Sequence, residues 1–266
     1  MVGQDRLLQD IRGMIQTETF PRFCIITGER GSGKKTLAKN ISKMFGNCIF
    51  SVAGIGIDDV RSVILQAYRL SGTQTLYLLP DADNMSVQAK NALLKVTEEP
   101  PNNAFFLMTL QDANNTLDTI RSRAVVFSMQ PYTQTDILQY VDTTHPELAQ
   151  VRDIVGEICE TPGEVDELSV LDVDQFYQFV QKVVQNIAEV STANALKIST
   201  QLCMKDGDTG YDLAMFWKAF LRICVDVGEL YWVKNTSKKL SQLKKVRGIN
   251  RQMLFDSWVL ELRGEV

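Results

Sequence analysis

The sequence predicts an α/β fold, in which a parallel sheet carries a phosphate-binding loop and is followed by a small helical lid and an all-α C-terminal domain. Three observations predict it. A glycine-rich run at residues 28–36 stands between an apolar strand pattern and a helix pattern. Short apolar segments alternate with amphipathic helical patterns as far as residue 130. Beyond Pro131 only helical periodicity continues, so we expect the sheet to lie in the first half of the chain.

Composition and charge exclude several classes of protein. The chain has 266 residues, of which 45% are hydrophobic and 23% charged, and this is typical of a globular protein with two or three domains. The net charge of −4 indicates no general affinity for nucleic acid, so any DNA contact must come from a local basic patch. Five widely spaced cysteines favour reduced thiols over a zinc site or a disulfide framework. Without a signal segment or an apolar run of about 18 residues, we expect a soluble cytoplasmic protein with no membrane attachment.

The first predicted domain, residues 1–130, consists of strands separated by helices. Its strands are apolar on both faces, which is typical of a parallel sheet covered by helices on both sides. In such sheets ligands bind at the carboxyl ends of the strands, where the glycine-rich run lies. We expect strands at residues 23–27, 48–52, 75–79, 104–109 and 125–129, and helices at residues 5–16, 34–45, 58–70, 86–97 and 117–121.

A helical lid is predicted at residues 131–170. It has helical patterns at residues 135–141 and 148–158, then a break at residues 161–163 before a further short helix. The acidic stretch at residues 166–174 is expected to be a linker.

The last predicted domain, residues 171–266, is entirely helical. Its apolar stripes favour the core of a helical bundle over a ligand site. The apolar surface of the helix at residues 211–231 could equally contact a partner subunit. The stripes lie at residues 176–187, 195–202, 213–227, 240–243 and 253–262.

The glycine-rich run is suited to holding a phosphate group. Gly28, Gly31 and Gly33 leave backbone N–H groups free to bind oxyanions, and the following helix presents the positive end of its dipole. Lys34 can reach a terminal phosphate. The next position calls for Ser or Thr, whose hydroxyl binds magnesium, but here it is Lys35. The sequence therefore predicts phosphate binding without metal-assisted hydrolysis.

The metal site lacks a second ligand if Pro80 occupies the position of the metal-binding carboxylate at the end of the third strand. The alternative is that Asp81 or Asp83 takes over this role. The lid also has no arginine between residues 154 and 170, where nucleotide-sensing lids often carry one. It offers carboxylates that would repel a γ-phosphate, namely Glu157, Glu160, Glu164, Asp166 and Glu167.

Arg121, Ser122 and Arg123 stand at the end of a short helix before the last strand. Arginines at this position can cap the carbonyl groups of the helix C-terminus. They can also act in trans on the nucleotide of a neighbouring subunit, as an arginine finger does. The residues alone leave both interpretations open.

Several of these segments together resemble the AAA+ subunits of bacterial clamp loaders. The run at residues 89–101 resembles the family's N-A-L-L-K-x-L-E-E-P-P signature, and residues 119–123 resemble its T-I-x-S-R segment, with Ala124 in place of the following cysteine. The resemblance is strong over residues 1–130, weaker in the lid and only architectural in the last hundred residues. Smaller matches lie at residues 31–38, 59–61, 81–83 and 249–254.

The resemblance is greatest to the stator-type members of this family and implies a role without ATP hydrolysis by this chain itself. Arg123, with Ser122 beside it, would serve as the arginine finger for an adjacent motor subunit. The implied partners are gamma/tau-like and delta-like loader subunits, the sliding clamp, and primed DNA through the assembly. The implied degenerate nucleotide site would bind ATP or ADP weakly, through Gly28, Gly31, Gly33, Lys34, Lys35, Thr36 and Asp81.

Three further expectations complete the sequence-based hypothesis. Zinc is not expected, because residues 45–48 connect helix and strand directly where family members carry a four-cysteine module. Lys90 and Lys95 could contact DNA phosphates, although two solvated lysines are an equal alternative. The competing functions are an active gamma-like ATPase that uses Asp81 and Thr36 as displaced metal ligands, and a DNA-binding AAA+ protein outside replication.

Overall fold

The computed structural model contains two compact units, which are described separately. The first comprises residues 1–137 with residues 161–163, and the second comprises residues 138–160 and the chain from residue 164 onward. The structure describes residues 1–69, 72–203, 211–245 and 248–264.

The first unit is built on a five-stranded sheet, as predicted. All strand pairs are parallel, and the strand order is β2-β3-β4-β1-β5. Every residue of β1 and β4 is buried, and so is every residue of β3 except the first. This burial explains why the three strands appear in the sequence as largely continuous apolar runs. The strands are β1 (Phe23–Thr27), β2 (Cys48–Val52), β3 (Gln74–Leu79), β4 (Ala104–Leu110) and β5 (Val125–Ser128).

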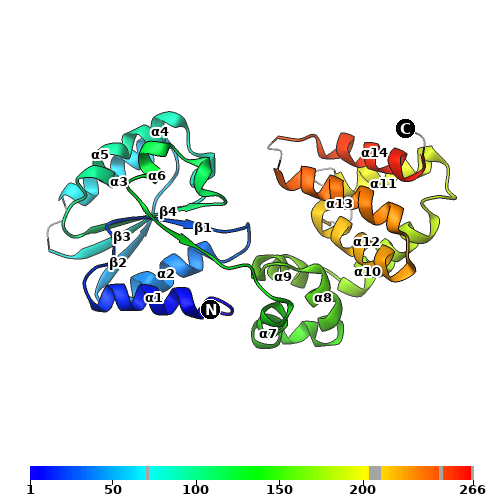
Figure 1. Cartoon of the computed structure of the whole chain (residues 1–266), viewed down its shortest axis with the longest axis horizontal. Coiled ribbons are helices and arrows are strands. Elements are labelled where there is room, and N and C mark those ends of the chain that lie inside the picture. Colours follow the sequence, from blue (N-terminus) through cyan, green and yellow to red (C-terminus); the bar gives the residue numbers. More distant parts are fainter. Residues whose placement is uncertain (70–71, 204–210, 246–247, 265–266) are drawn as a thin grey trace. The chain divides into compact units, whose positions relative to one another are not determined.

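Helices cover both faces of this sheet (Figure 1). Adjacent residues of a strand point to opposite faces, so Ile25 and Ile26 enter different cores. Ile26 packs with α1 (Asp5–Gln16) and α2 (Lys34–Met44). Ile25 packs with the other group of helices, which consists of α3 (Ile57–Arg69), α4 (Val87–Ala92), α5 (Leu94–Glu98) and α6 (Asp118–Arg121). The predicted end of the third helix at residue 70 lies outside the described residues.

The single helix expected at residues 86–97 is instead two short helices, so this prediction is wrong. Ser86 caps α4 by accepting a hydrogen bond from the Ala89 N–H at 3.1 Å. The helix then tightens, because the Leu93 N–H bonds to the carbonyl of Lys90, three residues back, at 3.1 Å. This turn places the fully buried Leu93 in the core under the sheet. Tertiary packing therefore interrupts a pattern that is helical by periodicity alone.

The predicted lid forms helices with different boundaries. They are α7 (Gln134–Thr144), a 3-10 segment (Pro146–Val151), α8 (Arg152–Ile158) and α9 (Pro162–Ser169). Pro162 is the first residue of α9, a position that needs no N–H donor. The acidic stretch 166–174 is not a linker, because it is divided between α9 and α10. Asp172 caps α10 by accepting a hydrogen bond from the Gln175 N–H at 2.9 Å.

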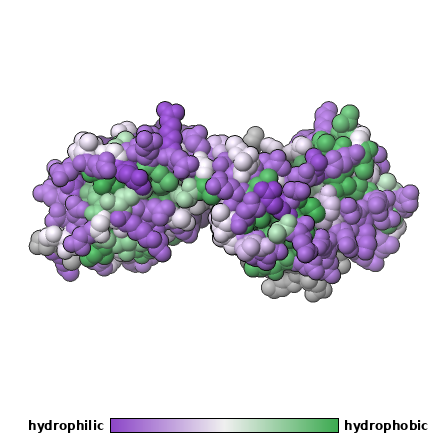
Figure 2. Space-filling model, turned by 90° about the horizontal axis from the view of Figure 1, so that it is seen from below, coloured by the Kyte–Doolittle hydropathy of each residue, from purple (hydrophilic) through white to green (hydrophobic). Residues whose placement is uncertain are grey.

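The C-terminal helices pack around an aromatic core, to which most of the apolar stripe of the helix at residues 211–231 contributes. Trp217, Phe255 and Trp258 are fully buried, and the rings of Trp217 and Phe255 stack at 6.3 Å. Val225, Val227, Leu230 and Tyr231 remain exposed near the α12–α13 turn. Figure 2 shows hydrophobic areas amid a mostly hydrophilic surface on both units. The helices are α10 (Val173–Asn186), α11 (Thr192–Cys203), α12 (Leu213–Val227), α13 (Leu230–Lys245) and α14 (Arg251–Leu262).

Acidic residues from the α8–α9 region form ion pairs with cations of the C-terminal helices. The Lys218 ammonium on α12 is nearly buried and lies 2.6 Å from Glu164 and 3.1 Å from Glu160. Lys244 lies 2.7 Å from Glu160, and Arg222 lies 2.9 Å from Glu157. These carboxylates were predicted to repel a γ-phosphate. Their charges are instead balanced within the second unit, so they do not act as a free acidic cluster.

The only histidine of the chain, His145, bridges two acidic residues. Its Nδ1 lies 2.7 Å from Glu147 and its Nε2 lies 2.9 Å from Asp166. Desolvation lowers the pKa of His145, but the hydrogen bonds and charges of Asp166 and Glu147 outweigh it and raise the pKa above the usual 6.5. The imidazole therefore links α9 to the segment after α7.

We expect the stability that His145 contributes to fall as the pH rises. A folded-state pKa above the unfolded value means that the stabilisation is complete below pH 6.5 and is lost as the pH passes through the raised pKa. Unfolding of the second unit can be followed by fluorescence, because all three tryptophans belong to it. The difference in melting temperature between the wild type and His145→Gln should be larger at pH 6 than at pH 9. A difference independent of pH would contradict this prediction.

Within the described part of the chain, no helix has the length and apolar character needed to cross a membrane.

Candidate functional site

The glycine-rich loop lies between the carboxyl end of β1 and the first residue of α2, as predicted. Gly31 and Gly33 have φ angles of 78° and 86°, in the left-handed region that side chains rarely adopt. Gly33 directly precedes α2, so the backbone of the loop lies at the positive end of the helix dipole. The sequence therefore builds the conformation of a phosphate loop.

The rest of the first unit holds this loop tightly. The Gly31 carbonyl accepts a hydrogen bond from the Gly163 N–H at 2.9 Å. A Cβ at Gly31 would lie only 2.6 Å from Thr161 Oγ1, so a side chain cannot be accommodated there. On another side, Tyr132 donates its hydroxyl proton to the Ser32 carbonyl at 2.7 Å. These contacts fix the shape of the loop.

Lys34 turns its ammonium group into the loop. Its Nζ donates hydrogen bonds to the carbonyls of Gly28 at 2.7 Å and Glu29 at 2.6 Å. Desolvation lowers the pKa of Lys34, and the negative charges of Asp81 and Asp83 partly oppose this shift. To bind a phosphate, the ammonium would have to exchange these carbonyl oxygens for phosphate oxygens.

Lys35 and Asp81 form an ion pair beside the loop, with 2.7 Å between the ammonium and the carboxylate. The lysine that replaces the expected hydroxyl is thus paired with Asp81, one of the two carboxylates considered as an alternative metal ligand. The lysine stands where a metal-binding hydroxyl is expected, and its charge neutralises the nearest carboxylate. Thr36, the displaced hydroxyl, is exposed. This donor set does not fit a magnesium ion, because a cation would have to displace the ammonium of Lys35 from Asp81, and the part of the chain that the structure describes has no cluster of three acidic, histidine or cysteine side chains that could hold a metal.

Asp83 is not available as a metal ligand either. It is buried, and its carboxylate accepts hydrogen bonds from the Gln111 N–H at 2.9 Å and from the Asn115 amide at 2.8 Å. Sequence reasoning missed Thr109, which is fully buried at the end of β4 and accepts a hydrogen bond from the Asp81 N–H at 2.9 Å. A hydroxyl near the end of an otherwise apolar strand was the available signal.

Arg123 is exposed and is held by two neighbours. Its Nη2 lies 2.8 Å from the Glu98 carboxylate, and its Nη1 donates to the Thr119 carbonyl at 2.7 Å. Ser122, also exposed, donates its hydroxyl proton to the same carbonyl at 3.2 Å. Arg123 therefore caps a helix carbonyl and is also accessible at the surface, so the two interpretations made from the sequence are compatible.

Arg121 bonds to residues that are near it in the sequence. Its guanidinium lies 2.7 Å from Asp118, three residues earlier, and also contacts the side-chain oxygen of Asn114. Arg123 by contrast links α6 to the segment that ends α5. Of the two arginines, Arg123 is the one held by a residue far from it in the sequence, Glu98.

The two lysines considered for DNA binding lie in different environments. Lys90 is buried, and its ammonium donates to the Asn115 carbonyl at 2.6 Å. It supports the loop after β4, and the prediction that it presents its charge at the surface is wrong. Lys95 is exposed on α5.

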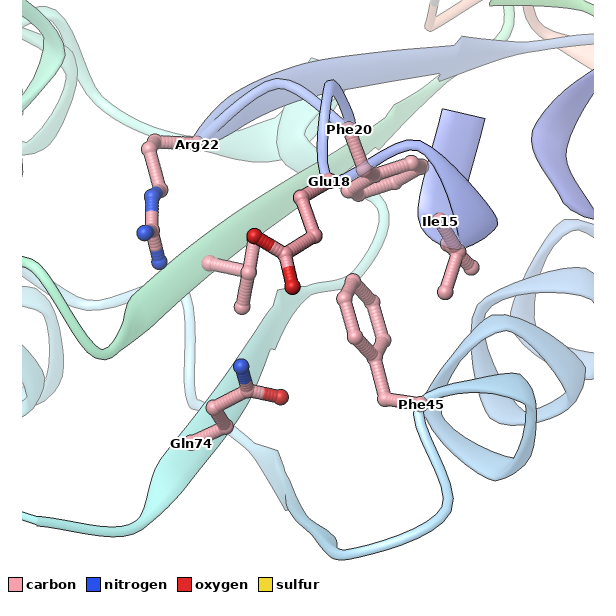
Figure 3. Close-up of a pocket in the computed structure, with 7 residues that line it drawn as sticks. Ile15, Glu18, Phe20, Arg22, Phe45 and Gln74 are labelled. Carbon is pink, nitrogen blue, oxygen red and sulfur yellow. The ribbon is translucent and has the colours of Figure 1, made fainter. Parts of the chain in front are cut away.

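A pocket of about 370 Å³ lies at the end of the sheet opposite the glycine-rich loop, near the amino ends of β1, β3 and β4. Figure 3 shows Arg22 and Phe45 on opposite sides of it, with Glu18 and Gln74 between them. The Arg22 guanidinium lies over the Phe105 ring at 4.5 Å. None of the residues predicted for the nucleotide site lines this pocket.

Comparisons with known proteins agree with the geometry of the first unit. A family model described as "DNA polymerase III, delta subunit" matches residues 48–133. The DNA polymerase III subunit gamma/tau of Mycoplasma pneumoniae is 28% identical over 167 residues, which are 52% of this chain and 24% of that protein. The subunit tau of Bacillus subtilis is 24% identical over 206 residues, which are 65% of this chain and 36% of that protein. Residues 48–133 therefore resemble the DNA polymerase III delta subunit family, and between half and two thirds of the chain is similar to DNA polymerase III subunits gamma/tau and tau.

A solved structure of similar length has the same fold. It is a DNA polymerase III gamma subunit-related protein from Thermotoga maritima, with a TM-score of 0.54 and 17% identity over 97% of this chain and 99% of that one. The AAA+ fold predicted from the sequence motifs is therefore confirmed. The chain spans only about a quarter to a third of the length of the two curated relatives.

Proposed function

We propose that this chain is a delta prime-like stator of the DNA polymerase III clamp loader. In this role it does not hydrolyse ATP but supplies Arg123 to the nucleotide site of an adjacent motor subunit. Its partners are gamma/tau-like and delta-like subunits, and the assembly loads the sliding clamp onto primed DNA. The observation that carries this proposal is the ion pair of Lys35 with Asp81, in the place where a motor subunit needs a hydroxyl and a free carboxylate for magnesium.

The exposed Arg123 supplies the other half of the proposal. A guanidinium at the surface can approach a phosphate group that another subunit holds, and its delocalised charge stabilises the negative charge of the transition state. A chain with an intact phosphate loop, no fitting metal site and such an arginine is suited to assist a neighbour's reaction. Ser122 shares the Thr119 carbonyl with Arg123 and helps to shape the segment.

ATP turnover by the purified chain, alone and together with a gamma/tau-type subunit, tests this proposal. We expect no turnover by the chain alone, even with sliding clamp and primed DNA, and stimulated turnover in the mixture. Lys34→Ala is the matched control, because it removes the phosphate-binding ammonium without changing the Arg123 segment. Turnover by the isolated chain that this substitution abolishes would exclude the stator role.

The alternative is an active gamma-like ATPase, and the names of the curated relatives favour it. In this case Asp81 would leave Lys35 and bind magnesium together with Thr36. The ion pair is exposed, so separating it costs little. The isolated-chain measurement above distinguishes the two functions.

We infer that any nucleotide binding by this chain is independent of magnesium. Titration of the purified chain with ADP should give the same affinity in magnesium and in EDTA, because Lys35 neutralises the carboxylate that would hold the ion. Lys35→Thr restores the hydroxyl and frees Asp81, so binding by this variant should become tighter when magnesium is added. A wild-type affinity that depends on magnesium would contradict the inference and favour the gamma-like function.

Direct DNA contact by this chain is proposed for Lys95 only, because Lys90 is buried. A lysine on an exposed helix face can bind phosphates without reading the sequence.

A further inference from the structure

We propose that Glu98 is the residue that positions Arg123 for its action on the neighbouring subunit. The inference rests on the proposed stator function and concerns the same site. Glu98 is the last residue of α5, and Arg123 follows the end of α6. Their ion pair, with 2.8 Å between Nη2 and the carboxylate, joins two motifs that lie 25 residues apart in the chain.

The backbone on both sides of this ion pair is firmly placed. Val96 on α5 and Ile120 on α6 are fully buried in the same hydrophobic core under the sheet. The two ends from which Glu98 and Arg123 project therefore have a fixed spacing. A carboxylate on a fixed helix end can hold a long side chain in one direction, which a mobile carboxylate could not do.

Two anchors of different origin define the orientation of the guanidinium. The Thr119 carbonyl belongs to the same segment as Arg123, whereas Glu98 comes from another helix. Two of the five N–H donors of an arginine are engaged in this way, and the other donors remain to bind phosphate oxygens. Arginine side chains have many rotamers in water, so an arginine without the Glu98 anchor would reach the productive orientation less often.

The ion pair is also weak enough to permit function. The side chain of Glu98 is 54% exposed and that of Arg123 is 38% exposed, so water screens their attraction. The guanidinium can therefore form bonds to a phosphate while Glu98 still directs it. Glu98 acts through Arg123 and need not touch the nucleotide.

Glu99 provides a matched control. It is the adjacent residue, it carries the same charge, and it is also exposed. Among the ion pairs of the described residues, none involves Glu99. A substitution here changes the net charge of the surface by the same amount but leaves the Arg123 anchor intact.

The test is steady-state ATP turnover of the reconstituted loader that contains Glu98→Ala, Glu98→Asp or Glu99→Ala. We expect Glu98→Ala to lower kcat about three- to tenfold, with the KM for ATP unchanged, because ordering of one long side chain is lost. Glu98→Asp should restore part of the rate, and Glu99→Ala should match the wild type. A wild-type kcat for Glu98→Ala in an intact assembly would overturn the proposal.

A double substitution separates positioning of Arg123 from a general structural role. In loaders that already carry Arg123→Ala, the further change Glu98→Ala should have no effect on the single-turnover rate. An equal reduction in both backgrounds would overturn the proposal, because it would mean that Glu98 acts independently of Arg123. If Arg123→Ala alone leaves turnover unchanged, it is the stator function itself that fails.

Discussion

Substitution of Arg123 by alanine should lower the ATP turnover of the assembled clamp loader by a factor of about a thousand or more, the range known for lost arginine fingers. Arg123 is exposed, and its guanidinium is oriented by Glu98 and the Thr119 carbonyl. Removal of the guanidinium would leave the charge that develops on the neighbour's phosphate without this partner. Because the side chain is at the surface, the substitution should affect neither folding nor assembly.

The measurement is the turnover of loaders reconstituted with wild-type chain, Arg123→Ala or Arg121→Ala, at matched concentrations. Arg121→Ala is the matched control, because that arginine stands two residues away and bonds to Asp118 and Asn114 and not to Glu98. Size-exclusion chromatography establishes that all three loaders assemble. Full turnover by the Arg123→Ala loader would disprove the finger assignment, and equal loss in both variants would indicate damage to the segment as a whole.

Lys218→Ala should destabilise the second unit by about 2 to 4 kcal/mol, near the range for removing one partner of a buried ion pair. The Lys218 side chain is only 7% exposed, and it neutralises Glu160 and Glu164. The substitution removes the ammonium 2.6 Å from Glu164 and one of the two lysines that pair with Glu160, and it leaves a cavity beside α12. The free energy of unfolding can be obtained from urea titration followed by tryptophan fluorescence.

A combined variant shows whether lost charge balance causes this effect. In Lys218→Met with Glu160→Gln and Glu164→Gln, no carboxylate charge is left beside the methionine, and the Lys244 ammonium that loses Glu160 is 44% exposed to water. This variant should recover most of the stability that Lys218→Met alone loses, because a buried ion pair contributes little compared with an apolar replacement. If the triple variant is as unstable as Lys218→Met, the stability of the unit does not depend on this charge balance.

Much of the first unit was predictable because its signals are local. Each strand is a short apolar run, and each helix has an apolar face of the right period, so both appear in a few consecutive residues. The phosphate loop is equally local, since Gly31 and Gly33 are needed for backbone angles of the loop itself. The break at Leu93 and the division of the acidic stretch at Asp172 could not be predicted, because packing and capping override periodicity there.

The roles of charged residues depended on distant partners and required the structure. Lys90 has the positive charge of a DNA-binding residue, but it is buried and its ammonium donates to the carbonyl of Asn115. Glu160 and Glu164 were interpreted as free acidic residues, but both meet Lys218, which lies more than fifty positions away. Sequence spacing gives no information on such contacts, because a side chain's effect depends on what surrounds it after folding.

The sequence by itself determined that this chain has a phosphate loop, a parallel sheet and a position after the loop lysine that cannot supply a hydroxyl ligand, since these depend on residue identity and local conformation. Only the tertiary structure decided that Lys35 meets Asp81 and that Glu98 meets Arg123. Each pair joins the ends of two elements that are separate in the chain. The parallel sheet and its helices bring these ends together, and the ends are close to each other only in the folded molecule.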